Sequence, residues 1–151
     1  SWILDSSATD HVTSSLNHFS SYVTIDPVIV KLPTGHHVTA THFGVVHFSN
    51  SFYLTNVLYI PSFTFNLISI SKLVRSLNCI LIFSSHSCVI QDAITKNQIG
   101  TVNVSDGLYT LASFSASIMT TITHPHCTQL PIDLWHFRLG HLSHDRLHIM
   151  K

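Results

Sequence analysis

The sequence predicts a mainly β protein, a mostly antiparallel β-barrel with one short helix. Three observations predict this class. Short runs of β-branched and aromatic residues recur at close, regular spacing through the first two thirds of the chain. A Pro/Gly turn sequence separates two of the earliest runs. Within this region, residues 67–77 switch to helical periodicity. Short strands at such spacing are typical of closed barrels and compact sandwiches.

The elements follow in order along the chain. Residues 28–32 and 37–41 are two β-branched runs across Pro33-Thr34-Gly35, and this pattern predicts a hairpin. The helix is expected after Pro61, where apolar residues repeat at helical spacing from Leu67 onward. The other expected strands are residues 45–48, 52–54, 57–60, 80–83, 89–91 and 108–111. The expected core residues are Trp2, Ile3, Leu4, Val57, Leu58, Ile60, Leu67 and Ile70.

A change in composition divides the chain near residue 112. We expect a β-barrel domain over residues 1–112, a Ser/Thr-rich linker over residues 113–130 and a helical segment over residues 131–151. In the last segment, Asp133 is an expected helix cap and Gly140 an expected helix end. The chain has no initiator Met and stops inside an expected helix, so we expect it to be a segment of a longer protein.

Composition narrows the function classes. Seven Lys and Arg residues balance seven acidic residues, so the chain lacks the positive charge that grips nucleic-acid phosphates. Its apolar runs are far shorter than the roughly 18 residues of a membrane span. Three cysteines at irregular spacing fit neither a disulfide framework nor a four-cysteine zinc site, so we expect a reducing, intracellular compartment.

The first chemical signal is an apolar strand that runs into an acidic residue. Trp2-Ile3-Leu4 leads to Asp5, which is followed by the small residues Ser6 and Ser7. Aspartic proteases need a carboxylate on a tight loop after a buried strand, a hydroxyl that braces it and a third small residue that permits close backbone approach. The alternative interpretation is a turn or helix cap, because Asp and Ser side chains readily bond to nearby backbone.

Four segments in order resemble one family. They read WILDSSATDHV, VKLPTGHHVTATHFGVV, NVLYIPSFTFNLISISKL and LWHFRLGHLSHDRL. Together they resemble the protease and gag-pre-integrase regions of copia-type retrotransposon polyproteins. The matching motifs are residues 2–11, 32–35, 57–61 and 66–69. The resemblance implies a retropepsin-like barrel that processes its own polyprotein, followed by the start of a gag-pre-integrase domain.

The resemblance also implies the residues of the site. Asp5 is the implied catalytic residue, with Ser6 and Ser7 in its loop. The hairpin is the candidate flap over an extended peptide, and the implied substrate-binding residues are Leu32, Pro33, Thr34 and Gly35. A protease of this type requires no cofactor. Its expected partners are a second copy of the chain and a polyprotein peptide; we expect no membrane partner, and nucleic acid only through the integrase region of a parent chain.

The dimer follows from the count of suitable carboxylates. Aspartic proteases need two carboxylates that share one proton. Asp5 is the single Asp followed by two small residues, so an active form requires a symmetric homodimer. The chain departs from the family pattern at Ser7, where the pattern has Gly, and a Cβ there is expected to strain the loop and loosen the pair. The alternative is therefore a catalytically inactive structural remnant.

A second signal is the pair His136 and His141. The integrase-type zinc module that the resemblance implies needs two such His residues and a Cys-x-x-Cys pair about thirty residues downstream. The chain ends at Lys151, before such a pair. Zinc is therefore expected only in a longer parent chain, and the alternative is that these imidazoles cap helix carbonyls or line a surface.

Overall fold

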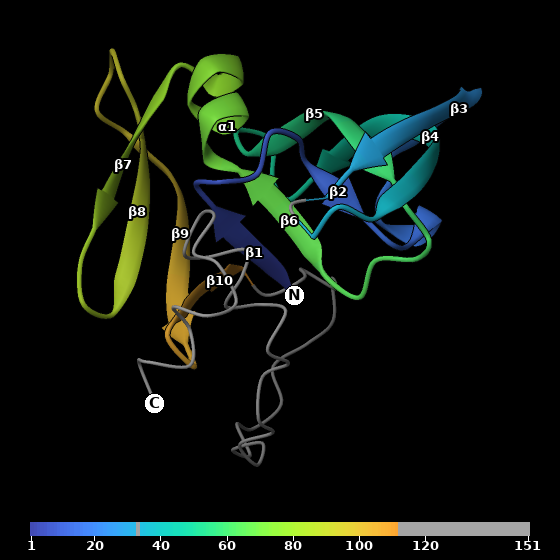
Figure 1. The fold of residues 1–151 in the computed structure, drawn as a ribbon. Helices are drawn as coiled ribbons and strands as arrows, with labels where there is room; N and C mark the ends of the chain where they lie inside the picture. The colour runs from blue at the N-terminus through green and yellow to red at the C-terminus, as the bar shows by residue number, and fades with distance from the viewer. Residues whose placement is uncertain (33, 112–151) are drawn as a thin grey trace, which may run out of the picture.

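Ten strands form one sheet in the part of the chain that the computed structural model describes, residues 1–32 and 34–111 (Figure 1). The strand order is β3-β4-β5-β2-β6-β1-β10-β9-β8-β7. The strands are β1 (Trp2–Asp5), β2 (Val12–Thr13), β3 (Ser21–Lys31), β4 (His37–His47), β5 (Tyr53–Tyr59), β6 (Asn66–Ser69), β7 (Cys79–Phe83), β8 (Ser87–Asp92), β9 (Gln98–Ser105) and β10 (Leu108–Leu111). A 3-10 turn, η1 (Leu16–His18), and a helix, α1 (Ile70–Leu77), complete the described elements. The mainly β prediction is confirmed.

The short strand β1 lies in the middle of the sheet order. It pairs antiparallel with β10 and parallel with β6. β2 pairs parallel with β5 and antiparallel with β6. The remaining neighbours are antiparallel, as predicted, but the parallel pairs at the centre were not predicted. They bring the carboxyl end of β1 beside the carboxyl end of β6.

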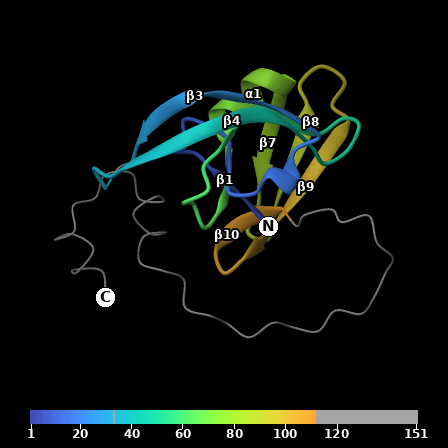
Figure 2. The same cartoon turned by 90° about the vertical axis from the view of Figure 1, so that its right-hand side faces the viewer.

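The predicted hairpin is present and longer than expected. β3 and β4 arch over one side of the molecule as a two-stranded ribbon (Figure 2). Gly35, with φ +84°, lies in the connecting turn, a conformation that glycine adopts without strain. β3 is the edge strand, and its register shifts between Thr24 and Val28, where the chain carries Pro27. Proline has no N–H to donate, so it is tolerated at an edge.

The helix begins later than predicted. The expected start at Leu67 is wrong, because Asn66–Ser69 forms β6 and α1 begins at Ile70. In such a short segment, a helix and a buried strand can show the same pattern of apolar residues, so periodicity alone does not distinguish a helix from a strand. Ser69 caps the helix by accepting a hydrogen bond from the backbone N–H of Lys72. Asn78, in the left-handed conformation, ends it.

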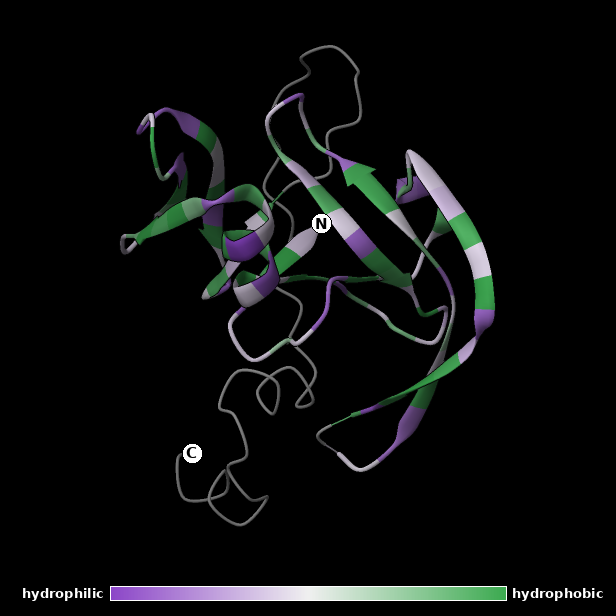
Figure 3. Cartoon of the chain, turned by 90° about the horizontal axis from the view of Figure 1, so that it is seen from above, coloured by the Kyte–Doolittle hydropathy of each residue, from purple (hydrophilic) through white to green (hydrophobic). Residues whose placement is uncertain are grey.

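The main hydrophobic core joins strands from both halves of the sheet order to α1. Its main cluster contains Trp2, Leu4, Ile68 and Leu73 together with residues from β5, β8 and β9. Along the longer strands, hydrophobic and hydrophilic residues alternate in short intervals (Figure 3). Among the predicted core residues, those buried are Trp2, Ile3, Leu4, Val57 and Ile60, and those partly buried against the clusters are Leu58, Leu67 and Ile70.

Two further strands, β2 and β9, were not predicted, because the first has only two residues and the second is interrupted by Gly and polar residues. The expected linker over residues 113–130 and helical segment over residues 131–151 lie outside the described residues. Within the described part, no helix is long and apolar enough to cross a membrane.

Candidate active site

Asp5 is the last residue of β1. Trp2 and Leu4 on this strand belong to the main core, whereas Ile3 belongs to a smaller cluster with Leu108. Side chains alternate across a strand, so Asp5 lies on the same face as Ile3. The strand is therefore held by its own buried residues, and its carboxylate emerges at the strand end on the less covered face.

Ser7 supports the Asp5 carboxylate. The backbone N–H and the hydroxyl of Ser7 both donate to Asp5 Oδ1, at 2.8 Å and 2.7 Å. Hydrogen bonds to a carboxylate are among the stronger ones in proteins. Ser7 is not among the residues with positive φ, so the expected backbone strain from its Cβ is not found. A serine at this position orients the carboxylate through two donors, where a glycine would offer one.

The loop that follows Asp5 is tied to the start of α1. Ser69 Oγ donates to the backbone oxygen of Ala8 at 2.7 Å, and the Ser69 N–H donates to His11 Nδ1 at 3.1 Å. Lys72 forms an ion pair with Asp10. Residues 6–11 are thus anchored at three points on one structural junction, where β6 turns into the helix.

Two titratable groups in this loop have shifted pKa values. Burial and, to a smaller extent, the nearby Lys72 ammonium lower the pKa of His11 to about 4, while Asp10 opposes the shift. Burial acts to raise the pKa of Asp10, but hydrogen bonds from Lys72 and Thr9 outweigh it and leave that pKa below its usual value. Near neutral pH the loop therefore carries a neutral His11 beside an Asp10–Lys72 pair.

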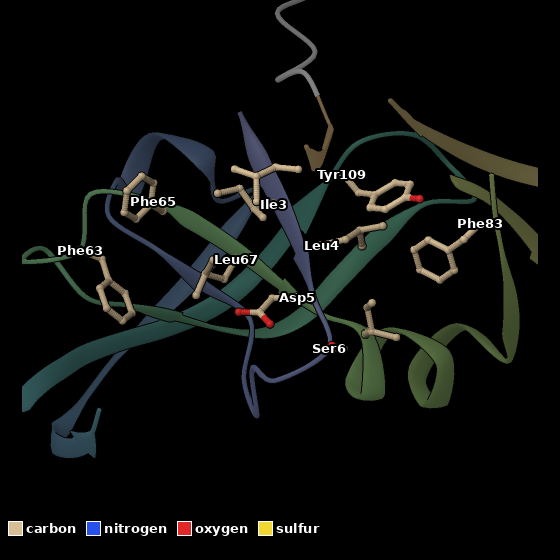
Figure 4. Close-up of a pocket in the computed structure, with 11 residues that line it drawn as sticks. Ile3, Leu4, Asp5, Ser6, Phe63, Phe65, Leu67, Phe83 and Tyr109 are labelled. Atoms are coloured by element: carbon tan, nitrogen blue, oxygen red, sulfur yellow. The ribbon is translucent and has the colours of Figure 1, made fainter. Parts of the chain in front are cut away.

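An apolar groove opens in front of Asp5 (Figure 4). Its volume is about 550 Å³. Its lining residues are Ile3, Leu4, Asp5, Ser6, Phe63, Phe65, Leu67, Ile70, Phe83, Leu108 and Tyr109. Asp5 is the one carboxylate among these side chains, and aromatic rings lie on both sides of it. A carboxylate facing an apolar groove is suited to hold and polarise a water or a carbonyl group there.

The other residues singled out from the sequence lie in different places. Ser6 is exposed and lines the groove next to Asp5. Leu32, Thr34 and Gly35 lie at the hairpin turn and are not among the groove-lining residues. Pro33, His136 and His141 lie outside the described residues. Within residues 1–32 and 34–111, no group of three or more His, Cys, Asp or Glu side chains is arranged to hold a metal ion.

The hairpin nevertheless reaches the groove indirectly. Val30 and Val38, near the hairpin turn, pack against a cluster that contains Val12, Ala40 and Ile60. Phe63 packs against the same cluster and also lines the groove. Phe63 therefore lies between the cluster under the hairpin and the groove.

Sequence reasoning missed the anchoring residues Ser69 and Lys72 and the aromatic lining of the groove. A serine before a helical run is a recognisable cap signal, and it could have marked Ser69 as the helix start. No local pattern indicates that its amide would meet His11, which is 58 residues away in the chain.

A family model and two curated proteins are similar to this chain. The family model described as the Pol polyprotein beta-barrel domain matches residues 2–78. The chain is 32% identical over 148 residues to the retrovirus-related Pol polyprotein from transposon RE2 of Arabidopsis thaliana. The match covers 94% of this chain and 10% of the relative. The chain is 30% identical over 146 residues to the corresponding polyprotein from transposon RE1 of the same plant, with 93% and 10% covered. The chain thus spans about a tenth of the length of these relatives. No solved structure matches it.

Proposed function

The chain belongs to the Pol polyprotein beta-barrel domain family of retrotransposon polyproteins, and on that premise we propose that it is an aspartic-type endopeptidase region that processes its polyprotein as a homodimer. The observation that carries the proposal is the Asp5 carboxylate, held by two hydrogen bonds from Ser7 at the mouth of an apolar groove. The motif that surrounds it supports a copia-type origin.

The arrangement around Asp5 suits peptide hydrolysis once a second carboxylate is present. In that reaction one carboxylate takes a proton from water while the other, protonated, gives its proton to the scissile carbonyl oxygen. The resulting tetrahedral diol collapses by breaking the C–N bond, and the leaving nitrogen takes up a proton. Both Ser7 bonds go to Oδ1, so they fix the orientation of the Asp5 carboxylate without using Oδ2.

The second carboxylate must come from another molecule. Asp5 is the one acid among the groove-lining residues, and a two-fold axis beside it would bring a second Asp5 into place. The apolar face around Asp5, with Ile3, Leu67 and Leu108, supports this because it offers surface that a second copy and a peptide would cover.

The substrate is proposed to be an extended peptide with large apolar side chains beside the cleaved bond. Aromatic side chains, among them Phe65 and Phe83, line the groove on either side of Asp5 (Figure 4). The β3–β4 hairpin is the proposed flap, and an extended peptide would pair with backbone groups as strands do. No cofactor takes part, and any zinc belongs to a longer parent chain.

A cleavage assay tests the proposal. The full chain would be incubated with fluorescence-quenched peptides whose central two residues are Phe, Leu or Tyr, between pH 4 and pH 7. We expect cleavage that a statine-containing transition-state mimic inhibits and that Asp5→Asn abolishes. The matched control is Asp106→Asn, which removes an exposed carboxylate at a turn with φ +51°, a conformation that asparagine tolerates.

A mixing experiment tests the shared site separately. If each active site uses one Asp5 from each copy, an equal amount of the Asp5→Asn chain should lower wild-type activity to about half by forming mixed, inactive dimers. Unchanged activity would contradict a shared pair. A folded dimer that cleaves none of the peptides, with or without Asp5, would instead support the alternative of an inactive structural remnant.

A further inference from the structure

His11 is a buried polar residue outside the groove. Its side chain is 1% exposed. Nδ1 accepts the hydrogen bond from the Ser69 N–H, so in the neutral ring the hydrogen lies on Nε2. Among the described residues, Nε2 has no hydrogen-bond partner. The packed ring therefore makes one hydrogen bond among the described residues, in which it acts as the acceptor.

Ser69 connects this contact to the carboxylate. It is the register partner of Asp5 across the parallel pair of β1 and β6. While its N–H donates to His11, its hydroxyl donates to the backbone oxygen of Ala8. The loop between Asp5 and His11 is thus hydrogen-bonded to Ser69 at its middle and at its far end. The same loop carries Ser7, which donates both hydrogen bonds to Asp5.

We propose that neutral His11 is a positioning residue for Asp5, and that protonation of its ring releases the loop from Ser69 and displaces the carboxylate. The effect on catalysis rests on the proposed function, whereas the release of the loop is a property of the folded chain alone.

Protonation breaks this contact for a simple reason. An imidazolium has hydrogens on both nitrogens, so Nδ1 can no longer accept the Ser69 N–H and two donors face each other. The charged ring would also lie among buried groups. The charged groups that act on it are Lys72 on α1, which repels the imidazolium, and Asp10 in its own loop, which attracts it. The low pKa of His11, about 4, agrees with this environment and places the release at acidic pH.

The substitution His11→Asn keeps a hydrogen-bond acceptor at this position but removes the titratable ring. The asparagine Oδ1 can occupy the place of Nδ1 and accept the Ser69 N–H, but it does not ionise in this range. His11→Leu removes the acceptor at every pH. The matched control is His86→Asn, which exchanges the same residue types at an exposed site.

Two measurements on the full chain decide the proposal. The first follows the NMR signals of the His11 ring and the Ser69 amide from pH 7 to pH 3 in the wild-type protein. We expect both to move together with a midpoint near 4. A Ser69 amide that does not follow the ring titration would overturn the proposal.

The second measurement is the pH profile of kcat and KM with the quenched peptides. We expect kcat of the wild type and of His86→Asn to fall together at the acid end. His11→Asn should keep the wild-type kcat at pH 6 and extend activity to pH values at least one unit lower, with little change in KM, while His11→Leu should lose kcat at every pH. If the wild type and His11→Asn lose activity at the same acidic pH, the positioning role is refuted. If the wild type cleaves nothing at any pH, the endopeptidase proposal fails, and the NMR titration still decides the release of the loop.

Discussion

Asp5 and Ser69 are register partners at the carboxyl ends of two parallel strands, β1 and β6. From this point the chain after Asp5 turns into a loop, while the chain after Ser69 turns into helix α1. The two segments leave the sheet side by side, so the helix cap and the loop anchor can be one residue. Ser69 serves both, because its hydroxyl accepts from Lys72 N–H and donates to the Ala8 carbonyl.

Replacing Ser69 by alanine should destabilise the protein, although the change removes only a hydroxyl group. Ser69→Ala removes a helix cap and leaves the part-buried Ala8 carbonyl without this donor, so we expect the free energy of unfolding to fall by about 1–3 kcal/mol. Urea unfolding at neutral pH measures it. The matched control, Ser76→Ala in the last turn of the same helix, is exposed and should change stability by less than about 0.5 kcal/mol. Equal effects of the two substitutions would argue against the anchoring role.

Acid should destabilise the protein in two steps. The pKa of His11 is lowered from 6.5 to about 4, so between these values the unfolded chain binds a proton that the folded chain does not. Stability is therefore expected to fall as the pH decreases through this window, by up to about 3 kcal/mol.

The second step comes from Asp10. Its pKa is also lowered, so its contribution is present above the ordinary value of 3.8 and is lost below it. Urea unfolding at a series of pH values checks both steps. In His11→Asn the first step should shrink while the second remains; an unchanged first step would assign the acid sensitivity to other groups.

The close contact between β3 and β4 depends on Gly44. A Cβ at this position would lie 2.2 Å from the Ser21 carbonyl oxygen and 2.8 Å from Tyr22 Cα. Both are backbone atoms, so the strands must separate, and Gly44→Ala is expected to lower the free energy of unfolding by about 1–3 kcal/mol. At Gly35 an added Cβ would meet open space, so only the positive φ opposes Gly35→Ala, and we expect the free energy of unfolding to fall by about 1 kcal/mol. Urea unfolding of both variants compares them, and a larger effect at Gly35 would contradict the steric reason.

Ser7 offers a test of local strain. Because its φ is not positive, Ser7→Gly should relieve nothing and should be less stable than Ser7→Ala by about 0.4–1 kcal/mol, owing to the greater freedom of glycine in the unfolded chain. The comparison of Gly with Ala isolates the Cβ, since both lack the hydroxyl that donates to Asp5. Thermal or urea unfolding decides the sign, and a glycine variant more stable than the alanine variant would reveal strain at this position.

Local patterns were sufficient for some parts of the molecule. The Pro33-Thr34-Gly35 turn between two β-branched runs predicts the β3–β4 hairpin, because turn chemistry acts within a few residues. The run that forms β10 was predicted with its observed bounds, Leu108–Leu111. Asp5 at the end of a buried strand was likewise predicted from its neighbours alone, and burial of Trp2 and Leu4 agrees with it.

Other parts depend on contacts between distant segments. Residues 67–69 were assigned to the helix, yet they belong to β6, because β1 lies beside this segment and pairs with each of its residues in turn. A strand of that length gains its stability from a neighbour that its own sequence does not specify. The same holds for β2, whose two residues pair with β5 and β6.

The sequence by itself therefore determined the mainly β class, the hairpin and the loop that carries Asp5, since these follow from residue types and short-range spacing. Only the tertiary structure decided that Ser69 and Lys72 anchor that loop, that His11 is buried as an acceptor, and that aromatic side chains from separate segments surround the carboxylate. These are contacts across many tens of residues, and they arise when parallel pairing of β1 with β6 brings two chain segments to the same end of the sheet.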